Sequence, residues 1–406
     1  MGNAHMTVSS TDLIHHGYVP PAGFAAPQPG VFKASTVFFP NVAAMRHFEW
    51  KDKTAYTYGL HGTPTSYTLE ERLCTLEGGQ QCLLVPSGLA AIATVSLALL
   101  KTGDEVLIPD NAYGPSKALA EAELRHWGIS HQFYDALNPQ DLASKIGPNT
   151  RLVWLEAAGS VTLEFPDLIE QVHICQAAKV LCALDNTWGA GLAFAPFDLL
   201  PGTGQPLAVD ISVHALTKYP SGGGDVLMGS VITRDPGLHM RLKLCHMRLG
   251  LGVAANDVEA VLRGLPSIQL RYTAHDQATR TLAQWCQTRP EFAQVLHPAL
   301  ANSPGHAHWL QLCQGGPGRA AGLLSVIFKP EYSQAQVDAF CDGLALFEIG
   351  YSWGGPVSLV VPYDLASMRT SWPNHLARGT LVRLSIGLEA VEDLQADLAQ
   401  ALHRLV

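Results

Sequence analysis

Three polar positions that follow short apolar runs have the residue types of a cofactor site. Lys218 follows the run 209–213, Asp185 ends the run 180–184, and Ser87-Gly88 begins the most apolar helical stretch. A desolvated lysine has a lowered pKa and can form a Schiff base with a carbonyl group. A carboxylate can keep a ring nitrogen protonated, and a helix N-terminus suits a phosphate. Together these parts meet the needs of pyridoxal 5′-phosphate.

Each of these residues taken alone fits an ordinary structural role. Lys218 could be a solvated surface lysine, Asp185 an Asx turn and Ser87 a helix N-cap. The combination favours a cofactor site, because one α/β region holds all three. The nucleotide loops GxxxxGK[ST] and GxGxxG are absent, as is an HExxH zinc motif. We therefore expect no metal site.

The elements that must position these residues alternate between about 66 and 235. Helical stretches at 70–76, 89–100, 116–126 and 168–177 interleave with apolar runs at 105–108, 151–155, 180–184, 209–213 and 226–232. Such alternation predicts an α/β fold with a mostly parallel sheet, in which ligands bind beyond the carboxyl ends of the strands.

The rest of the chain has different patterns. Residues 1–65 are rich in Gly, Pro and aromatics and predict an extended arm, and a long helical stretch covers 257–289. Strands at 322–329 and 380–386 with helices at 334–344 and 391–406 predict an α+β domain. We expect an arm (1–65), a large cofactor-binding domain (66–265) and a C-terminal domain (266–406). Met1 to His5 has the character of a short added segment before a natural start at Met6.

Eight short motifs occur along the chain in a distinctive order. They are Tyr58-Gly-Leu-His-Gly-Thr-Pro-Thr65, Leu76-Glu-Gly-Gly79, Pro86-Ser-Gly-Leu89, Asn111-Ala-Tyr-Gly-Pro115, Leu184-Asp-Asn-Thr-Trp-Gly-Ala-Gly191, Thr217-Lys-Tyr219, Tyr351-Ser-Trp-Gly-Gly355 and Leu381-Val-Arg-Leu-Ser-Ile-Gly-Leu-Glu389. With them, the chain from about residue 56 onward resembles the Cys/Met-metabolism family of fold-type-I pyridoxal-phosphate enzymes. The resemblance is closest to bacterial cystathionine β-lyases.

The resemblance implies a role for each site residue. The implied catalytic residues are Lys218, which carries the cofactor, Asp185, which pairs with the pyridine nitrogen, and Tyr113, which stacks on the ring. The implied phosphate contacts are Ser87, Gly88, Leu89 and Thr217, with Tyr58 from a neighbouring subunit, and Ser160 is implied to contact the ring hydroxyl. The implied substrate contacts are Arg383, which clamps the carboxylate, and Ser352, Trp353 and Tyr58 in the pocket.

Three positions depart from the family pattern. Leu60 stands where the family usually has a phosphate-binding arginine, with His61 beside it. Ala157-Ala158 replaces a common Ser-Pro, and Pro356-Val357 replaces an aromatic residue and a glutamate. The first departure concerns cofactor affinity, and the last concerns the substrate, because that loop borders the pocket.

The implied activity is β-elimination of cystathionine, cystine or a related cysteine S-conjugate to a thiol such as homocysteine, pyruvate and ammonia. It would serve methionine biosynthesis or transsulfuration. The alternative within the family is γ-elimination or γ-replacement on methionine, cystathionine or a homoserine ester. A cofactor-free binding protein and a hydrolytic metalloenzyme are rivals from other classes. The resemblance also implies a homo-oligomer, a dimer or homotetramer, whose subunits share active sites.

Composition narrows the partners and the compartment. The 406 residues are 47% hydrophobic and 15% charged, with a formal net charge of −9. This excess of acidic residues argues against binding to nucleic acid and to an anionic membrane surface. The eight cysteines form no CxxC pair, so we expect reduced, buried thiols in a cytoplasmic protein with a small amino-acid substrate.

Overall fold

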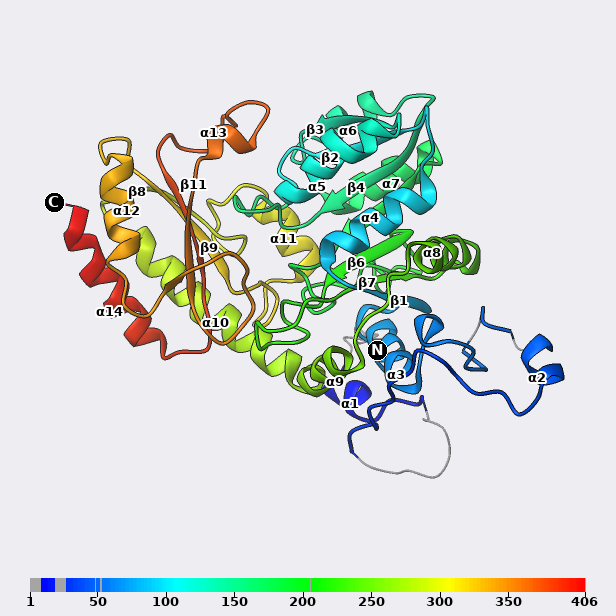
Figure 1. Cartoon of the computed structure of the whole chain (residues 1–406). Helices are drawn as coiled ribbons and strands as arrows, with labels where there is room; N and C mark the ends of the chain where they lie inside the picture. Colours follow the sequence, from blue (N-terminus) through cyan, green and yellow to red (C-terminus); the bar gives the residue numbers. More distant parts are fainter. Residues whose placement is uncertain (1–8, 19–26, 48, 52, 205, 406) are drawn as a thin grey trace.

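A computed structural model describes residues 9–18, 27–47, 49–51, 53–204 and 206–405, so the start at Met6 lies outside the described residues. Figure 1 shows two sheet layers, each covered by helices, with the N-terminal segments beside the larger one. The larger sheet has seven strands in the order β1-β7-β6-β5-β4-β2-β3. Its strands are β1 (Gln81–Val85), β2 (Glu105–Pro109), β3 (Ser130–Tyr134), β4 (Thr150–Glu156), β5 (Leu181–Asp185), β6 (Ile211–Ala215) and β7 (Gly229–Thr233).

The large sheet is mostly parallel, as the alternating pattern predicts. Only β7 runs against its neighbours β1 and β6, so the carboxyl ends of β1, β2, β4, β5 and β6 meet at one edge. Its helices are α3 (Pro64–Glu77), α4 (Gly88–Leu99), α5 (Gly114–Leu119), η2 (Ala120–Leu124), α6 (Pro139–Lys145), α7 (Leu168–Ala178), α8 (Pro236–Leu249) and α9 (Ala255–Gly264).

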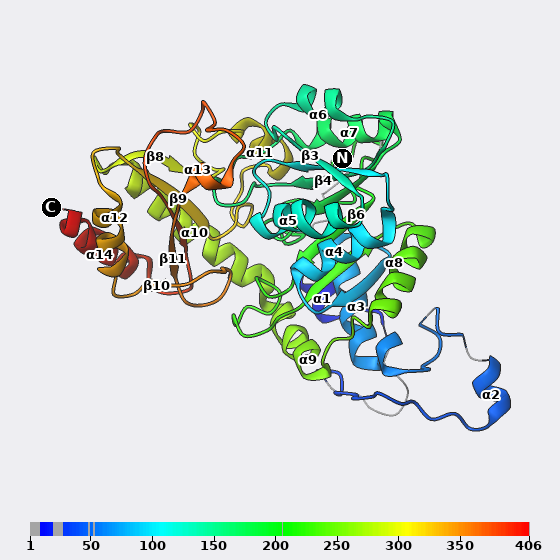
Figure 2. The same cartoon turned by 45° about the horizontal axis from the view of Figure 1, so that its top comes forward.

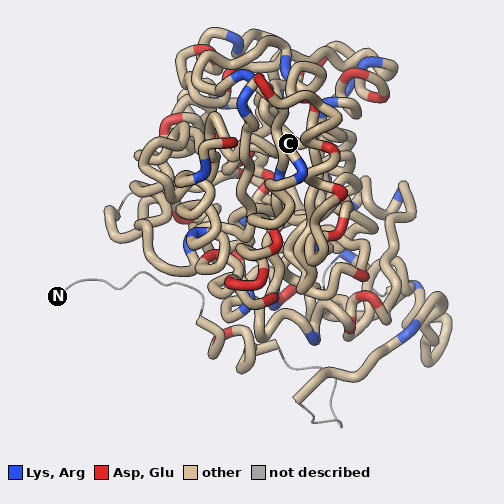
Figure 3. The backbone as a smooth tube through the Cα atoms, turned by 90° about the vertical axis from the view of Figure 1, so that its left-hand side faces the viewer, with Lys and Arg blue, Asp and Glu red and all other residues tan. Residues whose placement is uncertain are grey.

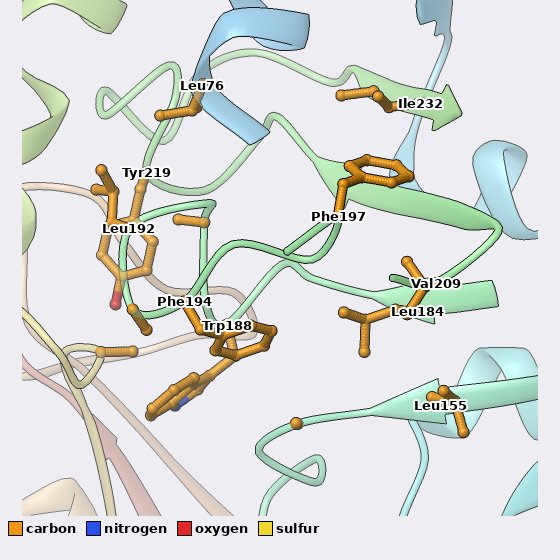
Figure 4. Packing of buried hydrophobic residues seen from close by; sticks show 14 of the residues in the cluster. Leu76, Leu155, Leu184, Trp188, Leu192, Phe194, Phe197, Val209, Tyr219 and Ile232 are labelled. Carbon is orange, nitrogen blue, oxygen red and sulfur yellow. The ribbon is translucent and has the colours of Figure 1, made fainter. Parts of the chain in front are cut away.

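Both faces of this sheet are buried, which explains why its strands are apolar without alternation. Leu184 packs with α3 and α7 on one face, whereas Ala183 packs with α4 and α8 on the other. Figure 4 shows the first of these clusters, in which Trp188, Phe194 and Phe197 extend the core beyond β5. This packing holds the carboxyl edge of the sheet rigid.

The smaller sheet has five strands in the order β10-β11-β12-β9-β8, antiparallel except for the β10–β11 pair. The strands are β8 (Phe292–Leu296), β9 (Leu323–Phe328), β10 (Glu348–Ile349), β11 (Leu359–Tyr363) and β12 (Leu381–Ser385). The helices after residue 267 are α10 (Ile268–Gln287), α11 (His306–Cys313), α12 (Gln334–Asp342), α13 (Leu365–Met368), α14 (Val391–Leu402) and η4 (His403–Leu405). Of these, α11 packs with the core of the large sheet. The long α10 runs from the large layer into the small one (Figure 2).

Several elements differ from the sequence expectation. The stretch 257–289 is not one helix, because Pro266 in the turn η3 (Leu265–Ser267) lacks the N–H that a continuous helix needs and separates α9 from α10. Strands β1, β3, β8, β10 and β11 and helices α6, α8, α11 and α13 have no counterpart among the predicted elements. The N-terminal arm contains α1 (Ser10–Ile14), α2 (Val42–His47) and η1 (Gly59–His61), and α2 projects away from the body in both views.

Other sequence expectations concern cysteines, charge and membranes. All eight cysteines are free and seven are buried, as expected of reduced thiols. Acidic and basic residues are interspersed along the chain (Figure 3). Within the described residues, no helix combines the length and apolarity needed to cross a membrane. The boundaries at residues 65 and 265 stay predictions.

Candidate active site

The carboxyl edge of the large sheet gathers most of the sequence-predicted residues. Asp185 ends β5, and Ser87, Tyr113 and Lys218 lie in the segments that follow β1, β2 and β6. The charge of Asp185 acts on both Lys218 and Tyr113, so these groups are close enough to interact. Arg383 enters from β12 of the smaller sheet and acts on Lys218 as well. The site therefore lies between the two sheets.

Lys218 is a mostly buried amine in a cationic setting. Its Nζ donates a hydrogen bond of 2.6 Å to the Ser352 hydroxyl and lies 5.2 Å from the centre of the Trp353 ring. Burial is the largest of the causes that lower the pKa of Lys218 to about 8. The charge of Arg383 adds to this shift, whereas the charge of Asp185 opposes it. A neutral amine near physiological pH is a nucleophile and a base.

Asp185 is a half-buried carboxylate without a cationic hydrogen-bond partner among the described residues. Thr187 donates its backbone N–H (3.0 Å) and its hydroxyl (2.5 Å) to the same oxygen, Oδ1. The Thr187 hydroxyl also accepts the N–H of Ala215 at the end of β6, which ties the two strand ends together. Burial raises the pKa of Asp185. A protonated ring nitrogen is the kind of cation that such a carboxylate can hold.

The start of α4 forms a close-fitting cradle. The Ser87 hydroxyl caps the helix by accepting the N–H of Ala90 at 3.0 Å. A Cβ on Gly88 would lie 2.6 Å from the Cβ of Ala215, so only glycine lets the backbone come this close to β6. Leu89 follows in the first turn, and Thr217 lies one residue before the lysine. Backbone N–H groups at a helix start form an anion site of the kind that a phosphate needs.

Arg383 carries a buried guanidinium that lacks a full set of partners within the described part of the chain. The side chain is 7% exposed, and its Nε has no hydrogen-bond partner there. One terminal nitrogen donates to the backbone oxygen of Ser352 at 3.2 Å, and the guanidinium lies 5.4 Å from the centre of the Tyr363 ring. Burial lowers the pKa of Arg383, and the nearby Tyr363, Tyr113 and Tyr351 oppose this. A buried guanidinium with a free donor fits the carboxylate of a small ligand.

Tyr113 lies at the start of α5 and is 43% exposed. Its backbone N–H donates to Glu156 Oε2 at 2.9 Å, and Glu156 pairs in register with Asp185 on the neighbouring strand. Burial and the charge of Asp185 raise the pKa of Glu156 well above its usual range. Ser160 donates its N–H to the backbone oxygen of Asn111 at 2.8 Å, which holds it beside the Tyr113 turn.

Comparison with known proteins agrees with this geometry. The profile of the family described as Cys/Met metabolism PLP-dependent enzyme matches residues 10–403.

The chain belongs to that family.

Its relatives include a cystathionine beta-lyase of Bordetella avium, 39% identical with 97% of each chain covered. A cystathionine beta-lyase of Salmonella typhimurium is 34% identical, with 92% of this chain and 93% of the relative covered. A crystal structure of cystathionine gamma synthase from Xanthomonas oryzae pv. oryzae superposes with a TM-score of 0.85 at 29% identity over 98% of each chain. The predicted family, the fold and the dependence on pyridoxal phosphate are confirmed.

The residues present fit the family's cofactor. The α4 cradle offers its N–H groups for the phosphate, Asp185 suits the ring nitrogen, and the Lys218 amine suits the aldehyde. The Arg383 Nε has no hydrogen-bond partner among the described residues, so this buried guanidinium keeps a donor for a ligand. The assignment of single residues to these roles stays a prediction.

Tyr58 is the predicted site residue that the structure does not bring to this group. It lies in the arm, 45% exposed, paired with Thr36 in a β-bridge and with its hydroxyl 3.5 Å from that of Ser35. The adjacent Leu60 and His61 line a cavity of about 480 Å³ between the arm, α3 and α8. Lys218 is not among the residues that line this cavity.

Sequence reasoning missed Glu156, Thr187 and Tyr363. The rule that found Asp185 could also have found Glu156, because it too ends an apolar run. Thr187 lies two residues after Asp185, where an Asx-type contact is common. No sequence signal marks Tyr363, whose contact with Arg383 depends on the pairing of β11 with β12.

Proposed function

We propose that this protein is a carbon–sulfur lyase that carries out β-elimination on cystathionine or a related thioether amino acid. The products would be a thiol, pyruvate and ammonia. The observation that carries the proposal is the placement of the Lys218 amine between the Ser352 hydroxyl, the Trp353 ring and the charge of Arg383. The names of the relatives from Bordetella avium and Salmonella typhimurium support it.

Arg383 would bind and orient the substrate. Its buried guanidinium can donate two hydrogen bonds to the α-carboxylate, which leaves the α-hydrogen free to face Lys218. The β12 strand and the Tyr363 ring hold the guanidinium in place. Because this contact exists before and during the reaction, it contributes chiefly to substrate binding.

Lys218 would then move the protons. With a pKa of about 8, roughly a tenth of the amine is neutral at pH 7 and can take the proton from Cα. The resulting ammonium can protonate the departing thiolate at the sulfur atom. When bound, pyridoxal phosphate takes up the electron pair left at Cα. Asp185 supports this by holding the ring nitrogen in its protonated form.

The Trp353 indole favours β- over γ-chemistry in this proposal. The centre of the ring lies 5.5 Å from that of Tyr219 and 5.2 Å from the Lys218 Nζ, so the indole would narrow the space beside the amine. A γ-elimination needs a second proton removal at Cβ, and a narrow site restricts the motion of the side chain. The γ-reaction remains the alternative, because the gamma synthase has the same fold.

We also propose that the active protein is a homo-oligomer with shared sites. Tyr58 makes its described contacts inside the arm, and the arm carries α2 away from the body. This is the arrangement expected if Tyr58 contacts the phosphate of a neighbouring subunit. A dilution series followed by sizing and activity tests the idea, and a fully active monomer would contradict it.

Identification of the keto acid tests the proposed reaction. Purified yellow holoenzyme is incubated separately with cystathionine, cystine, methionine and O-acetylhomoserine, and the products are identified by mass. We expect pyruvate to dominate with cystathionine and Lys218→Ala to abolish turnover. A preponderance of 2-oxobutyrate would overturn the β-assignment, and full turnover by Lys218→Ala would overturn the role of the lysine.

A further inference from the structure

The loop between β4 and α7 has a backbone that needs outside support. Val161 (φ 67°) and Leu163 (φ 56°) both lie in the left-handed region, which side chains with a Cβ rarely adopt. Ser160, the predicted contact of the cofactor ring, comes directly before them. Such backbone conformations persist where many surrounding contacts hold them in place, and they are frequent at functional sites.

Glu164 supplies that support from within the loop. Its carboxylate is 2% exposed and accepts hydrogen bonds from Asn111 (2.7 Å) and Thr162 (2.8 Å) on the large-sheet side. From the small-sheet side, Arg369 forms an ion pair with it and the His375 ring lies at 2.6 Å. Burial alone would raise the pKa of Glu164, but His375 and Arg369 outweigh it and lower the pKa to about 2. One carboxylate thus joins the two parts of the molecule.

Each side of this junction leads to a different half of the active site. The backbone oxygen of Asn111 accepts the N–H of Ser160, and Asn111 lies two residues before Tyr113, on the cofactor side. Arg369 lies six residues after Tyr363, whose ring packs on the substrate-side arginine. A parallel link is the Ser325 hydroxyl, which donates to the backbone oxygen of Val161 at 2.6 Å.

Ser325 strengthens the connection because of its place in the smaller sheet. It pairs in register with Arg383 across β9 and β12. The loop is therefore attached at Val161 to the β9–β12 strand pair, which carries Arg383. At Glu164 it is attached to the segment that follows β11. A shift of the loop would move Ser160 relative to Arg383.

We propose that Glu164 is a positioning residue that sets the distance between the cofactor side and the carboxylate-binding side of the site. This inference rests on the proposed function, since it needs Arg383 to bind the substrate. Loss of the Glu164 charge would remove the ion pair with Arg369 and weaken the contact with His375. The strained loop would then be held from the small-sheet side mainly by the hydrogen bonds of Arg369 to the Thr162 hydroxyl and of Ser325 to Val161. The cofactor would still bind to α4, Asp185 and Lys218, but the substrate would meet a misplaced guanidinium.

The test compares the holoenzyme variants Glu164→Gln and Asp397→Asn. Asp397 is the matched control, because it is a buried carboxylate that accepts backbone N–H groups at Ala345 and Leu346, within the smaller part alone. For Glu164→Gln we expect the KM for cystathionine to rise about tenfold and kcat to change less. Cofactor affinity, measured by fluorescence titration, should stay within about twofold of wild type, and hydrogen exchange in residues 157–165 should increase. The control should change none of these.

A double-mutant cycle makes the test specific to the junction. Arg369→Gln should reproduce the rise in KM, and the double variant should be no worse than either single one. Should Glu164→Gln fail to fold, Arg369→Lys and His375→Gln answer the same question with milder changes. Unchanged KM and unchanged exchange in these variants would overturn the proposal. Wild-type protein without lyase activity would overturn the proposed function instead, whereas the exchange measurement would still test the junction.

Discussion

Lys218 should be an unusually reactive lysine in the cofactor-free protein. Burial disfavours its ammonium form and the Arg383 charge adds to this, so the pKa is lowered from 10.5 to about 8. Below pH 8 the neutral amine is then about 300-fold more abundant than in a lysine with the ordinary pKa. The neutral fraction grows as pH rises and reaches half near pH 8. Reactivity toward an acylating reagent should follow the same curve.

Competitive acetylation measures this directly. Cofactor-free protein is treated with acetic anhydride between about pH 6 and about pH 11, and the extent of modification at Lys218 is read by peptide mass spectrometry. The exposed Lys101 serves as the internal reference. Arg383→Gln should move the Lys218 curve toward higher pH without restoring the ordinary value, because burial is the larger cause. A wild-type midpoint at about pH 10 or above would refute the reasoning.

Four further variants test the remaining parts of the site. Arg383→Ala should raise KM for every amino-acid substrate by about 10- to 100-fold, as expected for loss of a charge-assisted contact, while cofactor titration stays unchanged. Gly88→Ala should lower the free energy of unfolding by about 1–3 kcal/mol and weaken cofactor binding, because its Cβ would lie 2.6 Å from that of Ala215; a stable variant with normal cofactor affinity would contradict the close fit. Leu60→Arg should tighten cofactor binding in the same titration, unless another cation already fills that position. The low pKa of Glu164 (about 2 against 4.5) stabilises the fold above pH 4.5, and this stability is lost as pH falls through 2. The free energy of unfolding, measured with urea, should therefore fall between pH 5 and 2 by about 3 kcal/mol more in wild type than in Glu164→Gln.

The large sheet and its carboxyl edge can be predicted from the sequence. Continuous apolar runs between amphipathic helices require strands that are buried on both faces, and a polar residue at the end of such a run lies where ligands bind. That logic points to Asp185, Lys218 and the Ser87 cradle from local patterns alone. It fails at Pro266, because the missing N–H of this proline interrupts a long helical pattern. It also passes over β1, because Gln81–Val85 lies close to the helix that follows and merges with its apolar pattern.

The tertiary structure alone decides how the two sheets meet. Arg383 and Ser352 lie more than a hundred residues after Lys218, and only the pairing of β12 with β11 and β9 places them opposite the amine. Burial then determines the chemistry, because a lysine pKa near 8 comes from lost solvation and from the nearby Arg383 guanidinium. Neither cause produces a recognisable pattern in the sequence. The same holds for Glu164, whose partners come from both sheets. Sequence patterns record local geometry, whereas contacts between distant segments depend on the packed fold.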